Sequence, residues 1–300
     1  MAILMSKNQL DNARKNYYGK FYVTKKNLNF VDKVINKILI SIYLFKYMLV
    51  NIKRKFFRSI SISSSKKSIQ KSINFSINLD EKAIEKISNE LKLNNYTFIE
   101  NFLSEESYKY LINSWPNINH FDHHKTIIKH FSSGFRHNSE SSLNKTFSNF
   151  GDNFVLRKFY EFLLSNEFKN FYNKLIIFEK NSYELSAISS KIAPNNSYLI
   201  PHMDGVLKNK ETKQHYNFIL FLDGFEENPV LGGATGFYSD NEFKNPIFIP
   251  HTIRNSLVIY NQSQDFYHGF KTIECPKDII RKSVGFQIKP IILIFKYFEL

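Results

Sequence analysis

The stretch Tyr198-Leu-Ile-Pro-His202-Met-Asp204-Gly205 decides how this chain is interpreted, because a short β-run carries a histidine and an aspartate two residues apart. Alternate side chains of a β-strand point to one face of the sheet, so His202 and Asp204 can reach the same metal ion. Further along, Tyr267-His268-Gly269 places another histidine inside a β-run. Two histidines and one carboxylate form a ligand set typical of Fe(II) sites with open positions. We therefore expect a metal site made of His202, Asp204 and His268.

A second His-x-Asp sequence, His120-Phe-Asp122, competes with the first. It opens the His120–His130 cluster and follows Trp115-Pro116, where no β-run leads into it. We therefore interpret this cluster as a surface or substrate-loop feature, and we assign the metal to the later sequence.

Two other histidines compete with His268 for the third ligand position. His215 follows Asp204 after only a short loop and begins the next β-run. His251 has Arg254 only three residues after it, which is too near for a residue of the next strand. His268 is preferred because Arg281 follows it by 13 residues, far enough to lie on the next strand and return to the same site.

Arg281 and Ser283 stand at the start of the last clear β-run. A buried arginine needs an anionic partner, and its fork of N–H donors suits a bidentate carboxylate. An Arg–Glu pair at the rim of the fold would meet the same need. An arginine on a strand of an apolar barrel favours the carboxylate of a ligand.

Taken in order, His202-x-Asp204, Gly232-Gly-Ala-Thr235, His268-Gly269 and Arg281-x-Ser283 resemble the Fe(II)/2-oxoglutarate-dependent dioxygenases, in particular the prolyl-4-hydroxylase-like branch. The resemblance covers roughly residues 96–290. It implies that Fe(II) is held by His202, Asp204 and His268. It further implies that Arg281 and Ser283 bind the cosubstrate 2-oxoglutarate, with the Tyr198 hydroxyl as an additional contact. O2 is then consumed, and ascorbate is an optional reductant.

The activity implied by the resemblance is hydroxylation of a substrate with release of succinate and CO2. The substrate stays open between a prolyl residue, a small molecule and a lipid-linked sugar. The nucleic-acid demethylase branch is disfavoured, because it carries a second arginine six residues after the first, where this chain has Gln287. Two alternatives are a jelly-roll metal-binding or isomerase protein that does not use 2-oxoglutarate, and a non-catalytic interaction protein. The oligomeric state is not indicated.

Short β-runs separated by turn residues predict a mainly β fold with flanking helices. Such punctuation favours a sandwich or jelly roll, and the resemblance specifies a double-stranded β-helix. Asp80 and Ser104 are expected to cap two helices around a short strand at Tyr96. We expect a dioxygenase domain at 73–300, with a helical part at 73–180 and the β core at 181–300. Further helices are expected at 154–164 and 167–176, and strands at 183–192, 197–201, 216–222, 246–249, 256–260, 266–270 and 283–288.

Residues 1–72 carry the whole charge imbalance of the chain. They hold 16 of its 41 basic and 2 of its 27 acidic residues, so the remainder holds 25 of each and is neutral. We interpret them as a basic N-terminal extension with an apolar helix and a Ser/Lys-rich linker. Apolar positions with adjoining Lys/Arg at 31–58 predict binding to an anionic membrane surface, with packing against the protein body as an equal alternative. Nucleic acid is the less favoured partner.

Cys275 is the only cysteine, so no intramolecular disulfide can form. This usage fits a reducing compartment. We therefore expect a cytoplasmic protein, peripheral at the membrane if the extension binds lipid.

Overall fold

The computed structural model describes residues 74–118, 121–125, 128–136, 154–178, 182–203, 215–262 and 266–291, and of 122–136 it describes the backbone alone. The predictions for the extension at 1–72 and for Asp204 lie outside these residues. None of the described helices is long and apolar enough to cross a lipid bilayer.

All described strands belong to one hydrogen-bonded sheet of 11 strands, which folds over into two layers. The first layer has the order β1-β9-β6-β11-β4-β3 and the second the order β5-β10-β7-β8, while β2 pairs with β3. The layers join where β3 pairs with β5 over a short register. The first layer comprises β1 (Tyr96–Ile99), β9 (Ser256–Asn261), β6 (Tyr216–Asp223), β11 (Arg281–Pro290), β4 (Tyr183–Ala193), β3 (Ile128–Arg136) and its partner β2 (Asp122–Lys125). The second comprises β5 (Tyr198–His202), β10 (Tyr267–Phe270), β7 (Gly236–Tyr238) and β8 (Pro246–Phe248).

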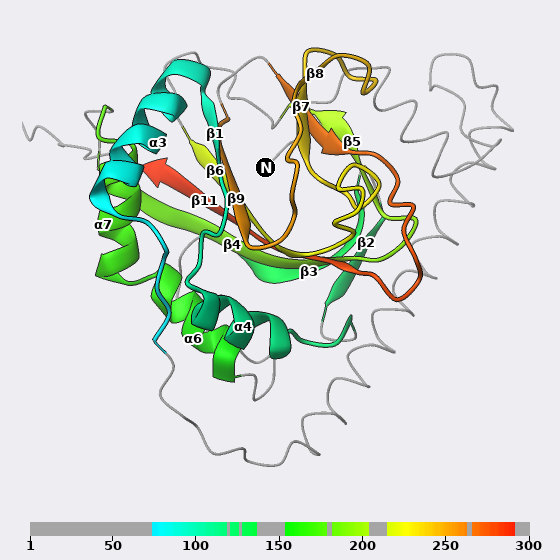
Figure 1. Ribbon diagram of the computed structural model, residues 1–300, viewed down its shortest axis with the longest axis horizontal. Coiled ribbons are helices and arrows are strands. Elements are labelled where there is room, and N and C mark those ends of the chain that lie inside the picture. The colour runs from blue at the N-terminus through cyan, green and yellow to red at the C-terminus, as the bar shows by residue number, and fades with distance from the viewer. Residues whose placement is uncertain are drawn as a thin grey trace, which may run out of the picture.

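Consecutive strands from β4 to β11 pass from one layer to the other, except that β7 and β8 form a hairpin within the second. All the pairings are antiparallel. This order is that of a double-stranded β-helix, or jelly roll, as expected. Figure 1 shows β1, β6 and β9 across from β5, β7 and β8.

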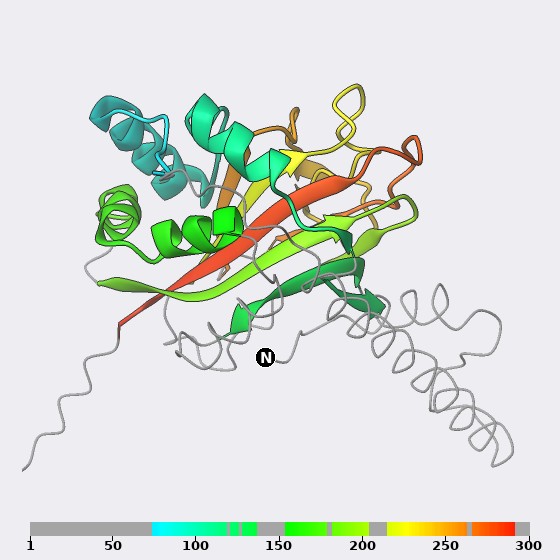
Figure 2. The same cartoon turned by 90° about the horizontal axis from the view of Figure 1, so that it is seen from below.

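Four helices lie against the outer face of the first layer (Figure 2). Two of them begin at the predicted capping residues: Asp80 accepts a hydrogen bond from the Ala83 N–H at 2.7 Å, and Ser104 from the Ser107 N–H at 3.3 Å. The helices are α3 (Glu81–Asn94), α4 (Glu105–Asn113), α6 (Phe154–Leu163) and α7 (Asn166–Leu175).

The two faces of β11 have different neighbours, and this division positions the site. Val284, Phe286 and Ile288 belong to the apolar core beneath the helices. Phe286, for example, stacks on Phe218 of β6 with ring centroids 4.7 Å apart. Side chains alternate along a strand. The odd-numbered positions of β11 from Arg281 to Gln287 therefore face the inner side of the layer, between the two layers.

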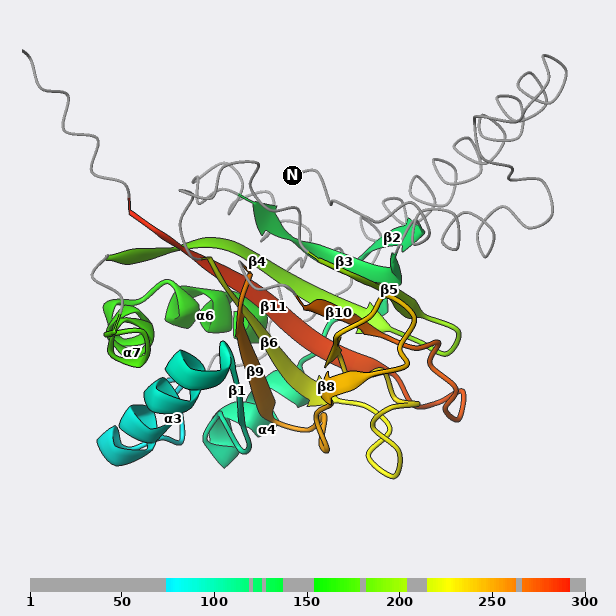
Figure 3. The same ribbon diagram turned by 90° about the horizontal axis from the view of Figure 1, so that it is seen from above.

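The structure differs from the sequence prediction in two places. The stretch around His120–His130, expected to be loop, contains β2 and β3, which extend the first layer beside β4 (Figure 3). The part expected to be helical therefore contributes β1, β2 and β3 to the sheet. The strand β7 was also not predicted, because its three residues are all buried and show no alternation.

Candidate functional site

His202 and His268 lie directly opposite each other on the paired strands β5 and β10. Their ring centroids are 4.3 Å apart, and the side chains are 2% and 5% exposed. The structure thus brings together, inside the fold, two predicted ligands that are 66 positions apart in the sequence.

The His202 ring is oriented by its own strand. Its Nδ1 lies 2.8 Å from the Ile200 carbonyl oxygen. A carbonyl can only accept, so Nδ1 carries a proton, and in the neutral ring Nε2 then carries the lone pair that a metal requires. A histidine fixed in this tautomer by a backbone carbonyl is the usual arrangement of a metal ligand.

Gly269 allows β10 to approach β5 closely behind the histidine pair. A Cβ at this position would lie 2.6 Å from the Leu199 carbonyl oxygen and 2.9 Å from the Pro201 nitrogen. Both neighbours are backbone atoms and cannot move aside cheaply. Glycine is therefore required after His268 because a larger residue would prevent the close contact between β10 and β5.

Asp204, the third predicted ligand, lies outside the described residues. Within the described ranges, no group of three His, Cys, Asp or Glu side chains could hold a metal ion. The histidine pair is therefore the described part of the candidate metal site, and Asp204 stays a prediction.

Arg281 lies on the same inner face. Phe270 follows His268 by two residues on β10, and its ring centroid is 4.6 Å from the Arg281 guanidinium carbon. The Phe221 ring lies 5.1 Å from the same carbon. Phe270 thus connects the histidine pair to the arginine, and the two rings form an apolar, cation-tolerant environment.

The charge of Arg281 is not balanced by any described carboxylate. The side chain is buried, and its one described hydrogen bond runs from Nη2 to the Thr235 hydroxyl at 3.2 Å. Its Nε and the nearby Ser283 Oγ are buried without a hydrogen-bond partner in the described part of the chain. Burial lowers the pKa of Arg281 to about 9. Buried donors of this kind fit a carboxylate ligand.

Gly233 explains the Gly-Gly sequence that precedes Thr235. Its φ of 88° lies in the left-handed region that favours glycine. A Cβ there would lie 3.0 Å from Arg281 Cδ and 2.8 Å from Ile273 Cδ1. The turn therefore packs against the aliphatic part of the Arg281 side chain and places the Thr235 hydroxyl within hydrogen-bond distance of the guanidinium.

Tyr198 occupies a less favourable place than its spacing suggests. Counting by two puts it on the face of His202, but the register shifts between His268↔His202 and Phe270↔Leu199. The shift puts Leu199 opposite Phe270, on the Arg281 side. No hydrogen bond joins Tyr198 to Arg281 or Ser283 in the regions described. Its contact with the cosubstrate stays a prediction.

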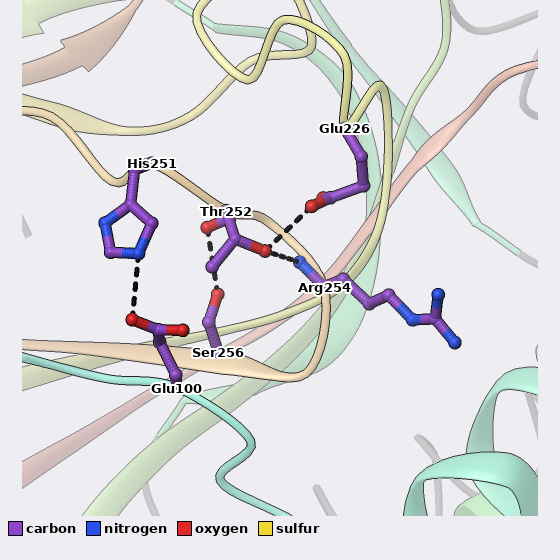
Figure 4. A network of polar contacts seen from close by, with 6 residues as sticks. All are labelled: Glu100, Glu226, His251, Thr252, Arg254 and Ser256. Atoms are coloured by element: carbon purple, nitrogen blue, oxygen red, sulfur yellow. Dashed lines mark hydrogen bonds and ion pairs between the residues drawn. The ribbon is translucent and has the colours of Figure 1, made fainter.

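The two competing histidines lie in other surroundings. His251 is exposed, and its Nε2 lies 2.8 Å from Glu100 (Figure 4). Thr252, the next residue in that loop, donates a hydrogen bond from its hydroxyl to Glu226 at 2.7 Å. His215 is half-buried just before β6, and its burial lowers its pKa. Neither shows a described contact with His202.

The sequence did not reveal that Thr235 binds Arg281, or that Phe221 and Phe270 enclose it. Thr235 is part of the Gly232-Gly-Ala-Thr235 motif that resembles the family, but nothing in the sequence indicates a role for its hydroxyl. The two phenylalanines could not be distinguished, because the chain has 30 of them and their contact depends on how the layers face each other.

Comparison with known proteins gives structural matches only. No protein-family model matches the chain, and no curated protein matches it. A prolyl-4-hydroxylase from Pseudomonas putida is similar at 11% identity, with a TM-score of 0.47, over 69% of this chain and 99% of that chain. A prolyl hydroxylase from Trichoplax adhaerens is 12% identical over 70% of this chain and 90% of that chain, with a TM-score of 0.47.

An oxidoreductase of the 2OG-Fe(II) oxygenase family from Burkholderia pseudomallei is 11% identical, over 73% of this chain and 95% of that chain, with a TM-score of 0.45. Identities of this size leave function to be decided by the side chains of the site. The fold itself follows from the strand order given above.

Proposed function

We propose that the protein is an Fe(II)- and 2-oxoglutarate-dependent oxygenase. The observation that carries the proposal is the buried Arg281, which has no described acidic partner and lies on the inner face that also holds the His202–His268 pair. A metal-only jelly roll would have no need for such an arginine, because a buried charge without a partner is costly.

The residues of this chain fit both Fe(II) and 2-oxoglutarate. His202 and His268, with Asp204 as the predicted carboxylate, would hold the metal. Arg281 and Ser283 would hold the far carboxylate of 2-oxoglutarate, since Arg281 Nε and Ser283 Oγ are buried donors without a hydrogen-bond partner in the described part of the chain. When bound, these groups supply oxidising chemistry in which O2 and 2-oxoglutarate give succinate, CO2 and a hydroxylated substrate.

The protein's part is to orient these groups and to exclude water. The tautomer of His202 is fixed by the Ile200 carbonyl. The aromatic rings on Arg281 keep its charge in a dry environment, where its attraction to a carboxylate is strong. The substrate is one of the three candidates named above, a prolyl residue, a small molecule or a lipid-linked sugar.

Metal binding and succinate release from 2-oxoglutarate test the proposal together. His202→Ala and His268→Ala should lose Fe(II) binding and turnover while keeping the fold. His251→Ala is the matched control, because this histidine is exposed and bound to Glu100, and it should keep both activities.

Two outcomes would contradict the proposal in different ways. Metal binding without any consumption of 2-oxoglutarate would favour the metal-binding alternative. Loss of metal in His120→Ala but not in His202→Ala would move the metal site to the His120–His130 cluster.

A further inference from the structure

Four side chains from four neighbouring strands form a hydrogen-bonded row across the first layer. Ser186 of β4 donates to Gln287 Oε1 at 3.1 Å. Gln287 Nε2 of β11 donates to Asn217 Oδ1 at 3.3 Å, and Asn217 Nδ2 of β6 donates to the Tyr260 hydroxyl at 2.9 Å. We call these four residues the polar row.

The polar row lies on the inner face, at the end away from Arg281. Gln287 follows Arg281 by six residues on β11, and the register with β4 does not shift between them. Both side chains therefore lie on the same face of the strand. Its far end reaches the metal site, because the Tyr260 ring lies 5.0 Å from the His268 ring. Arg281 and Ser283 are buried, whereas Gln287 and Asn217 are half-buried. The inner face is therefore open to solvent at the row.

Both amides are held in place by their neighbours. The Ser186 hydroxyl lies 3.1 Å from both the backbone carbonyl oxygen and the Oε1 of Gln287, and Gln287 Nε2 points toward Asn217 Oδ1. Only one hydrogen of Gln287 Nε2 is used in the row. The other has no acceptor among the described residues, although the group is held in place. A preorganised donor of this kind favours binding of an acceptor from outside the chain.

Gly285 lies between Ser283 and Gln287 on the same face. A Cβ at this position would lie 3.2 Å from the Lys191 ammonium nitrogen. Because Gly285 has no side chain, the inner face is less crowded beside the polar row, and the Lys191 side chain is the neighbour there. The row itself carries no formal charge, so it favours a neutral acceptor over an anion.

We propose that Gln287, held in place by Asn217, orients the substrate of this oxygenase by binding an uncharged carbonyl oxygen, such as that of an amide. The inference rests on the proposed function and narrows its substrate class to groups that present a neutral acceptor near His268. Binding of an anionic group at the neighbouring Lys191 is the outcome that would contradict it. Tyr260 is the positioning residue that joins the row to the metal site.

Acetamide and acetate are suitable probes, because they have nearly the same shape and differ in charge. Full-length protein is loaded with Mn(II) and saturating 2-oxoglutarate, and the relaxation of the probe methyl protons is measured by NMR. Paramagnetic relaxation falls steeply with distance from the ion, so the signal reports binding beside the metal without any turnover. Acetamide should be relaxed more strongly than acetate.

Gln287→Ala and Asn217→Ala should each weaken the acetamide effect by about 2- to 12-fold, the range expected for one hydrogen bond. Gln287→Glu keeps the volume but replaces the donor nitrogen with an oxygen, and it should also lose the effect. Lys289→Gln is the matched control, since Lys289 lies on the same strand and pairs with Glu184 at 3.1 Å on the surface. Melting temperatures verify that each variant is folded.

Stronger relaxation of acetate, lost in Lys191→Met, would assign the ligand to Lys191 and overturn the inference. An acetamide effect unchanged in folded Gln287→Ala and Asn217→Ala would reduce the row to a structural role. Failure of the proposed function has a different signature, in which Mn(II) is not bound or binds equally well to His202→Ala. That result would overturn both.

Discussion

Replacing Arg281 with methionine should weaken 2-oxoglutarate binding and leave the ligand-free protein as stable as the parent or more stable. The guanidinium is buried between Phe221 and Phe270, and its one described hydrogen bond goes to Thr235. No carboxylate of the described chain pairs with it. Burying a cation without an acid costs free energy, whereas methionine fills a similar space without charge.

The size of the effect follows from the loss of one partner of a buried charge pair. Such a loss costs about 2–5 kcal/mol, or roughly 30- to 5000-fold in affinity. At a concentration 100 times its Kd, 2-oxoglutarate would stabilise the parent by about 2.7 kcal/mol. If the substitution weakens binding about 100-fold, the same concentration stabilises the variant by only about 0.4 kcal/mol.

Thermal unfolding with and without 2-oxoglutarate, in the presence of Mn(II), measures both parts of the prediction. Arg254→Met is the matched control, because its guanidinium lies 5.6 Å from the Tyr108 ring at the surface. It should keep the shift caused by the ligand. The reasoning is refuted if Arg281→Met unfolds at a much lower temperature without ligand and still shows the full shift with it.

Three further expectations concern other parts of the molecule. Gly269→Ala should lower both the free energy of unfolding and the metal affinity, since its Cβ would lie 2.6 Å from the Leu199 carbonyl oxygen; urea unfolding with and without Mn(II) measures this, and unchanged values would count against the close strand contact. Burial and the nearby Lys289 lower the pKa of His215, so the unfolded chain binds its proton first and stability should decrease as the pH falls below 6.5; a profile unaltered in His215→Asn would exclude this cause. Full-length protein should bind anionic vesicles less well at high salt, and protein starting at residue 73 should not bind them; binding that ignores salt would leave only the packed-helix alternative.

The β core could be predicted because its strands alternate and end at turn residues. The expected strand at 183–192, for example, is observed as Tyr183–Ala193, and 216–222 as Tyr216–Asp223. Asp80 and Ser104 cap helices because their side chains are short acceptors at the correct positions. The hairpin of β2 and β3 was missed because its sequence is polar and its pairing depends on distant β4.

The site could be predicted only where spacing along one strand decides it. Arg281, Ser283 and Gln287 share a face by simple alternation, so Gln287 could have been found by counting on from Ser283. Tyr260 and Asn217 depend on the register between strands, which no local pattern encodes. Tyr198 illustrates the converse, because the register shift in β5 changes the face that counting assigns to it.

The position of β11 has a consequence for synthesis of the protein. β11 is the last described strand in the sequence, yet it lies in the middle of the first layer, between β4 and β6 (Figure 3). At roughly 5–20 residues per second, about 5–20 s pass between translation of the end of β4 and the end of β11. Once β6 has also been made, and until β11 follows, the facing edges of β4 and β6 have unpaired backbone groups, which can pair with other chains. The first layer is therefore completed only after residue 290 has been made, and Arg281 reaches its place in the site only at that final step.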